Sequence, residues 1–348
     1  MRISKKWWNG ALMLVLCSMF LTGCHVPEQG NTQEPSKAED KMEIGITFDS
    51  FVIERWQRDR DLFVAAAQEL GADVNVQNAN GSIEEQARQI EYFIKKKVDA
   101  IVVVQVADEG GNLIEAVADA HHAGIPVVAY DRQIMNAGAD LYISFDNEAV
   151  GRLMGEHMRS HLNGQGKLLQ ICGPLADNNV SQVMTGFEKA LADSELSIVM
   201  TEHADNWLAE TGFSVTSGYL GEMAVPDGIM CGNDSIAGQA IRALSEHRLA
   251  GCVCVVGQDA DLDACQRIVE GTQCMTVYKP VEKLARRAAE LAVELARGGK
   301  IEVSREISDG TNQIPYECLE PVAVTKENMD EIITGKYHEE NEIYLNIK

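Results

Sequence analysis

Residues 100–106 read Ala-Ile-Val-Val-Val-Gln-Val, and this stretch decides the fold class. It is almost entirely apolar and rich in β-branched side chains, which favour strands. A strand with one face in water alternates apolar and polar residues, whereas a strand in a parallel sheet covered on both faces is apolar throughout. The stretch therefore predicts a buried strand inside an α/β sheet.

Strands and helices alternate on both sides of this run. Apolar residues at helical spacing, and short apolar runs between them, are the pattern of βα units in a doubly wound sheet. Ser82 and Glu85 form a capping pair for a helix that ends at Lys97. The other predicted helices cover 54–70, 112–123, 149–162, 180–192, 208–221, 235–247, 262–270 and 281–297, and the other strands 43–48, 73–78, 126–130, 167–171, 198–202, 228–231, 253–256 and 275–278. We therefore expect two α/β lobes of similar design, each a doubly wound, Rossmann-like sheet.

Length and charge indicate the number of domains and exclude one class of partner. The chain has 348 residues, which suggests about two domains. Its 53 acidic and 30 Lys and Arg residues give a formal net charge of −23. Proteins that track a phosphate backbone need a basic surface, so we expect no nucleic-acid partner.

The N-terminal segment has the features of a lipoprotein signal peptide. Arg2, Lys5 and Lys6 precede an apolar stretch, 10–21, that is short for a membrane span. The stretch ends in Leu21-Thr-Gly-Cys24, a bacterial lipobox pattern. We expect a signal peptide over 1–23, acylation of Cys24 (palmitate and related chains), a flexible tether over 24–41, and an extracytoplasmic protein anchored in the cell membrane. The alternative is an ordinary secretory signal with an incidental cysteine.

The remaining cysteines do not predict a metal site. They are Cys172, Cys231, Cys252, Cys254, Cys265, Cys274 and Cys318. Most lie in apolar runs, so we expect mainly reduced, buried thiols. Cys252 and Cys254 would share one face of a strand, but no histidine or second cysteine pair follows at zinc spacing. A calcium-loop pattern that begins at Asp259 has Ala264 where the loop needs glycine. We therefore expect no metal and no cofactor.

Polar residues follow the carboxyl ends of the predicted strands, where open α/β sheets bind their ligands. Asp, Asn and Arg side chains make paired hydrogen bonds in a fixed plane, which suits the vicinal hydroxyls of a sugar, and tryptophan stacks on its C–H faces. The alternative for each single Asp or Asn is a helix N-cap. Because arginine and lysine share the site with the carboxylates, we expect binding and no enzyme activity, with a glycosidase as the open alternative.

Several motifs give the chain a specific resemblance. They are Glu54-Arg-Trp-Gln-Arg-Asp-Arg-Asp61, Ala129-Tyr-Asp-Arg132, Tyr142-Ile-Ser-Phe-Asp-Asn-Glu148, Asp177-Asn-Asn179, Gly257-Gln-Asp-Ala-Asp-Leu262 and Met275-Thr-Val-Tyr-Lys-Pro280. Together they resemble the periplasmic sugar-binding proteins of bacterial ABC importers, of the D-xylose-binding type, from about residue 41 to the C-terminus. The resemblance implies a type I fold of two lobes joined by three hinge crossings. The ligand contacts that it implies are Arg55, Asp131, Arg132, Asn179, Asn233, Asp259 and Lys279, with Trp56 and Trp207 as the stacking pair.

The expected organisation follows from the same resemblance. The N-terminal lobe would cover 42–145 plus about 280–310, and the C-terminal lobe 146–279 plus about 311–345. We expect the chain to capture D-xylose or a similar monosaccharide by hinge closure and to deliver it to an ABC permease. The alternative is an extracellular xylose sensor that signals to a membrane histidine kinase.

Overall fold

The computed structural model describes residues 41–107, 113–222, 225–303 and 305–347. Residues Lys41–Lys348 form one compact unit. The predicted signal peptide, the lipid acceptor Cys24 and the tether up to residue 40 lie outside the described residues. Among the described helices, none is long and apolar enough to cross a membrane.

The first sheet has seven strands in the order β11-β12-β5-β4-β3-β1-β2. Its pairs are parallel except β11–β12, which is antiparallel. The strands are β1 (Glu43–Phe48), β2 (Asp73–Asn78), β3 (Ala100–Val103), β4 (Val127–Tyr130), β5 (Leu141–Phe145), β11 (Arg305–Ser308) and β12 (Gln313–Leu319). β3 is fully buried along its length, which confirms the prediction drawn from the apolar run.

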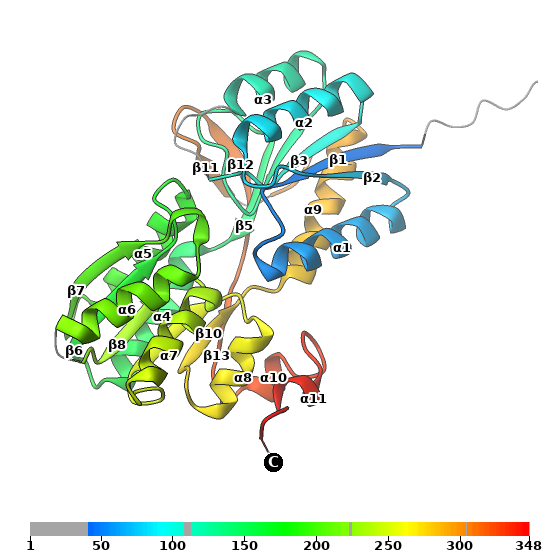
Figure 1. Cartoon of the computed structure of the whole chain (residues 1–348). Helices are drawn as coiled ribbons and strands as arrows, with labels where there is room; N and C mark the ends of the chain where they lie inside the picture. The colour runs from blue at the N-terminus through cyan, green and yellow to red at the C-terminus, as the bar shows by residue number, and fades with distance from the viewer. Residues whose placement is uncertain (1–40, 108–112, 223–224, 304, 348) are drawn as a thin grey trace, which may run out of the picture. The chain divides into compact units, whose positions relative to one another are not determined.

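The second sheet has six strands in the order β13-β10-β9-β8-β6-β7. Only the edge pair β10–β13 is antiparallel. The strands are β6 (Gln165–Cys172), β7 (Glu195–His203), β8 (Gly228–Cys231), β9 (Cys254–Gln258), β10 (Met275–Tyr278) and β13 (Val322–Val324). The two sheets form the two α/β lobes predicted from the sequence (Figure 1).

Helices cover both faces of each sheet. On the first sheet, α1 (Glu54–Glu69) and α9 (Val281–Ala296) share one apolar core, and α2 (Ile83–Lys96) and α3 (Leu113–His122) share the other. On the second sheet, α4 (Asn147–His161) and α5 (Asn178–Leu191) pack on one face and α6 (Glu210–Glu222) and α7 (Asp234–Glu246) on the other. A further core holds α8 (Leu262–Glu270), α10 (Met329–Ile332) and α11 (Glu340–Ile343), and a short 3-10 helix covers Asp205–Trp207. Each parallel strand therefore ends between helices, and side chains that follow it point to the rim of the sheet.

The chain passes between the two sheets three times. It crosses from β5 to α4, from β10 to α9, and from β12 to β13. The last crossing differs from the expected boundary near residue 310, because β12 pairs with β5 and so keeps 313–319 in the first sheet. Only two of the seven residues of β12 are buried, so its sequence gave little signal for the pairing.

The burial of the cysteines matches the prediction only in part. Cys172, Cys231, Cys254 and Cys265 are buried, and the cysteines in the described part of the chain are all free thiols. Cys252, however, is exposed and precedes β9, so it does not share a strand face with Cys254.

Candidate ligand-binding cleft

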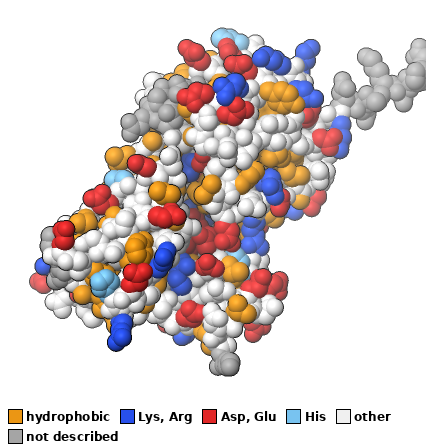
Figure 2. Space-filling view, viewed as in Figure 1, with side chains coloured by type: hydrophobic (Ala, Val, Ile, Leu, Met, Phe, Trp, Pro, Cys, Tyr) orange, Lys and Arg blue, Asp and Glu red, His pale blue; other side chains and the backbone are white. Residues whose placement is uncertain are grey.

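A cleft between the two lobes brings together all nine residues predicted to bind ligand. Its lining includes Arg55, Trp56, Asp131, Arg132, Asn179, Trp207, Asn233, Asp259 and Lys279. In the space-filling view, acidic side chains gather at the waist between the upper and lower parts of the molecule (Figure 2).

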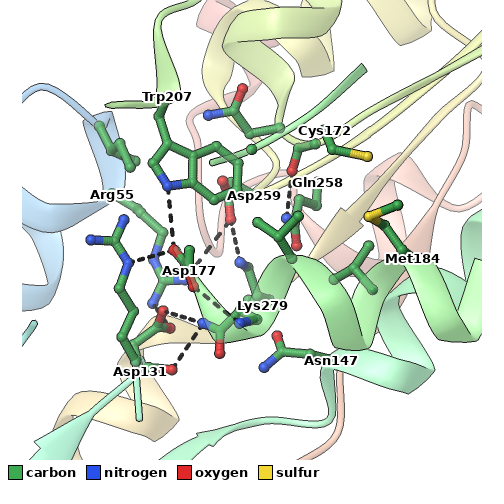
Figure 3. Close-up of a pocket in the computed structure, with 18 of the residues that line it drawn as sticks. Arg55, Asp131, Asn147, Cys172, Asp177, Met184, Trp207, Gln258, Asp259 and Lys279 are labelled. Carbon is green, nitrogen blue, oxygen red and sulfur yellow. Dashed lines mark hydrogen bonds and ion pairs between the residues drawn. The ribbon is translucent and has the colours of Figure 1, made fainter. Parts of the chain in front are cut away.

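Arg55 is the central cation of the cleft (Figure 3). It lies in the first turn of α1, just beyond β1, and its side chain is only 2% exposed. Its Nε and Nη2 atoms donate to the Asp59 carboxylate at 3.2 Å, and Nη2 donates to Oδ2 of Asp131 at 2.8 Å. Nη1 lies 3.8 Å from Oδ1 of Asp259 in the second lobe. Three carboxylates therefore fix the plane of one buried guanidinium.

Asp131 follows β4 directly and has a backbone φ of 63°, which few residues other than glycine adopt. Its carbonyl oxygen accepts hydrogen bonds from the hydroxyls of Tyr142 and Ser144, at 3.1 and 2.7 Å. Burial alone would raise the pKa of Asp131, but the charges of Arg55, Lys279 and Arg132 outweigh it and hold that pKa below its usual value. Asp131 is therefore a fixed, ionised acceptor at neutral pH.

Arg132 joins the two lobes. Nη1 donates to Oδ2 of Asp49 at 2.7 Å and to the carbonyl oxygen of Gln105 at 2.9 Å, both in the first lobe. Nε lies 2.8 Å from Oδ2 of Asp177 in the second lobe. Burial raises the pKa of Asp177 while Arg132 opposes that shift. The planar fork of the guanidinium allows one side chain to hold both lobes.

The second lobe presents two residues that are helix caps as well as cleft residues. The side chain of Asn233 accepts from the backbone N–H of Ile236, and that of Asp177 accepts from the backbone N–H of Asn179. The cap interpretation is therefore correct for these two, and both also line the cleft. Asn179 donates from Nδ2 to the carbonyl oxygen of Asp131 at 3.0 Å, which is a second link between the lobes.

Asp259 and Lys279 form an ion pair at the carboxyl ends of β9 and β10. Nζ of Lys279 lies 2.7 Å from Oδ1 of Asp259, but the angle does not meet that of a hydrogen bond. Both side chains are less than a tenth exposed. Asp259 has a φ of 100°, so each lobe aims one aspartate into the cleft from a strained backbone position.

The two tryptophans come from different lobes. Trp56 follows Arg55 in α1, and the guanidinium carbons of Arg55 and Arg132 lie 4.5 and 5.6 Å from its ring centre. Trp207 donates from Nε1 to Oδ2 of Asp177 at 3.3 Å. A Cβ atom on Gly173 would lie 2.4 Å from the Trp207 ring, so the absence of a side chain there makes room for the indole.

Two buried polar atoms of the cleft have no hydrogen-bond partner among the described residues, Nε1 of Trp56 and Oε1 of Gln258. A buried polar group left unsatisfied costs about 1–3 kcal/mol, so such atoms point to a ligand that supplies donors and acceptors. The charged side chains of the lining are three cations and three carboxylates, which balance and suit a neutral ligand.

Sequence reasoning missed several residues of the cleft. Asn147, Asp177 and Gln258 are less than a tenth exposed and line it, together with the apolar Cys172, Met184 and Met230 (Figure 3). Asp177 and Gln258 follow strands, and Asn147 lies in a quoted motif, so the strand-end rule could have found them. The methionines gave no signal, because an apolar residue in a helix or strand is usually part of the core.

Two α/β lobes that enclose a polar cleft at the carboxyl ends of their strands define a two-lobed solute-binding protein of the periplasmic type. The comparisons agree: residues 44–300 match the family described as "Periplasmic binding protein domain". The chain belongs to this family.

Two relatives and one solved structure are similar over most of their length. The D-xylose-binding periplasmic protein of Haemophilus influenzae is 41% identical, covering 89% of this chain and 94% of its own. The protein of the same name from Escherichia coli is 38% identical, covering 95% and 98%. A solute-binding protein of an ABC transporter from Clostridium phytofermentans, solved with bound β-D-glucose, has a TM-score of 0.77 at 26% identity and covers 86% of this chain and 99% of its own. These relatives are binding proteins, and the prediction that the chain is not an enzyme is confirmed.

Proposed function

We propose that the chain captures a monosaccharide, with D-xylose as the favoured ligand, and delivers it to an ABC permease. The observation that carries the proposal is the cleft itself, whose nine predicted residues come from both lobes and include unsatisfied buried polar atoms. Arg55, Asp131, Arg132, Asn179, Asn233, Asp259 and Lys279 bind the hydroxyls, and Trp56 and Trp207 stack on the ring. Net neutrality of the lining favours an uncharged sugar over a sugar acid or an amine.

Capture takes place by hinge closure. Polar groups of the two lobes already meet across the cleft, Arg132 with Asp177 and Asn179 with Asp131. A ligand that bonds to both lobes stabilises the closed arrangement and shifts the population toward it. The closed lobes then present one continuous surface to the permease. Hydroxyls buried among paired charges are shielded from water, so each hydrogen bond gains strength.

Relatives named for D-xylose at 38% and 41% identity support D-xylose as the ligand. The test is a thermal-shift series on the purified chain with pentoses and hexoses, followed by calorimetry on each hit. At 100-fold over its dissociation constant, a ligand of the folded state adds roughly 2.7 kcal/mol of stability. A rise with D-xylose alone supports the proposal. A higher melting temperature with a different sugar, and none with D-xylose, refutes the choice of ligand. No change in melting temperature with any sugar refutes the site.

The partner and the anchor are parts of the same proposal. Co-purification with a permease supports import, whereas co-purification with a membrane histidine kinase favours the sensor alternative. The lipobox at Leu21-Thr-Gly-Cys24 after an apolar segment supports acylation of Cys24 and retention on the outer face of the cell membrane. Incorporation of a labelled fatty acid that is lost in Cys24→Ser is the expected result. Equal labelling of the variant would refute the anchor.

A further inference from the structure

Two histidines and two cysteines meet in the second lobe, away from the cleft. They are His157 and His161 of α4, Cys254 at the start of β9, and Cys274, which directly precedes β10. One possible ligand atom from each residue lies within 4.8 Å of those of the other three. None of the four lines the sugar cleft. We refer to them as the His–Cys cluster.

Helical spacing and the packing of α4 on β9 and β10 bring these four side chains together. His157 and His161 are four residues apart in one helix and so project from the same face. That face packs on β9 and β10, because Met154 and Met158 share a core with Cys254 and Met275. The backbone N–H of Cys274 donates to the carbonyl oxygen of Val255 at 2.9 Å, which holds the two cysteine segments side by side.

The cluster also leaves a metal-binding atom unsatisfied. Nε2 of His157 is buried and has no hydrogen-bond partner in the described part of the chain. Nε2 of His161 lies 4.0 Å from Sγ of Cys274, and both cysteines are free thiols. The two imidazole rings are inclined to each other by 28°, with centroids 6.0 Å apart. A buried ring nitrogen without a partner is costly, and a metal ion would satisfy it.

We propose that the His–Cys cluster is a structural metal site for Zn²⁺ or a similar thiophilic divalent ion, held by two thiolates and two imidazoles. In a tetrahedral zinc site, bonds of about 2.3 Å to sulfur and about 2.0 Å to nitrogen place the ligand atoms about 3.4–3.8 Å from one another. The ligand atoms of the cluster lie within 4.8 Å of one another, so the longest of these distances must shorten by about 1 Å when the ion binds. Soft sulfur ligands disfavour Ca²⁺ and Mg²⁺, which take oxygen. Four protein ligands leave no open position, so the ion is structural.

The site lies at the opposite end of the strands that carry part of the sugar site. Asp259 and Lys279 each follow the corresponding cysteine by five residues, which at about 3.3 Å per residue separates the two regions by roughly 16 Å. The ion would tie α4 to β9 and β10. The sequence predicted no metal site because the ligands come from three separate segments without the compact spacing of a zinc motif.

The test measures metal binding by the full chain, purified in detergent under reducing conditions and stripped with a chelator. Co²⁺ titration should give one equivalent bound, with the visible absorption of a tetrahedral site and thiolate charge-transfer bands, and Zn²⁺ should displace it. The variants are Cys274→Ser and His157→Gln. The matched control is Cys252→Ser, because Cys252 is an exposed thiol two residues from Cys254 and outside the cluster.

Loss of the Co²⁺ spectrum in both cluster variants, with the control unchanged, supports the proposal. Zn²⁺ should then raise the melting temperature of the wild type and the control but not of His157→Gln. Cooperative unfolding and unchanged sugar affinity in the cluster variants show that they are folded. No Co²⁺ spectrum in the wild type, an equal loss in Cys252→Ser, or a Cys254–Cys274 disulfide found by mass spectrometry in chain purified separately without reductant would each overturn it.

Discussion

Replacing Asp131 by asparagine separates the role of the carboxylate in binding from its role in the fold. The variant keeps the shape of the side chain but loses the negative charge, so the 2.8 Å bond from Nη2 of Arg55 is no longer made to a carboxylate. Arg55 retains two bonds to Asp59 and the approach to Asp259, so no cation is left unpaired. A hydrogen bond to a charged group contributes about 1.5–3 kcal/mol, which is the expected loss of unfolding free energy.

The same free-energy range applies to the binding of the ligand. If Asp131 accepts from a sugar hydroxyl, its neutralisation weakens binding by roughly 10- to 150-fold, at about 1.4 kcal/mol per tenfold change. Isothermal calorimetry with D-xylose measures the affinity, and urea unfolding measures the stability. The sugar affinity and the free energy of unfolding are measured on the same purified variant.

Asp59→Asn is the matched control. Asp59 is fully buried, also binds Arg55 and accepts from the hydroxyl of Tyr130, but it does not line the cleft. It should lose at least as much stability as Asp131→Asn, with a much smaller loss of affinity. The reasoning is refuted if Asp131→Asn binds sugar as tightly as the wild type, or if the two variants lose the same affinity.

Three further predictions concern the cleft. Gly173→Ala places a methyl group 2.4 Å from the Trp207 ring and should weaken sugar binding in calorimetry, whereas Gly218→Ala, with open space around it, should not. Trp56→Phe removes a buried N–H that has no partner among the described residues, so affinity should fall by roughly 2- to 12-fold; an unchanged affinity would contradict this. The pKa of Asp131 in the folded chain lies below its usual 3.8. The contribution of its carboxylate to sugar binding is therefore complete above pH 3.8 and is lost as the pH falls through the lowered pKa. Asp131 itself should therefore add no pH dependence between about pH 5 and pH 8, so the wild type and Asp131→Asn should show the same relative change in sugar affinity across that range, and a difference between them would count against the assignment.

Local patterns predicted the elements well where apolar residues dominate. β3 and its neighbours are buried on both faces, and their runs of Val and Ile identify them without knowledge of their partners. Ser82 accepts from the backbone N–H of Glu85, as the capping pair predicted, although Glu85 itself pairs with Arg88.

Long-range pairing could not be predicted in the same way. β12 joins β5 across more than 170 residues, and Tyr316 donates to the carbonyl oxygen of Phe145 across a separation of 171. Only Ile314 and Tyr316 of the seven residues of β12 are buried, so the apolar pattern of this strand does not identify its partner. The cleft was predictable because strand ends meet at one edge of a sheet, whereas the His–Cys cluster depends on a contact between a helix and two strands.

The order of the strands also determines when each lobe can be completed. The second sheet draws five of its six strands from one continuous segment, 165–278, but the first sheet needs β12, and its core needs Leu284, Ala288 and Ala292 of α9. Until α9 (Val281–Ala296) is available, one face of the N-terminal segment is uncovered, and until residues near 319 are available β5 has only β4 as a strand partner. During synthesis, the lobe that begins first can thus be completed only late. A polypeptide that must pass through a membrane before folding gains time from this arrangement, because the first lobe cannot close around its core until nearly the whole chain has been made.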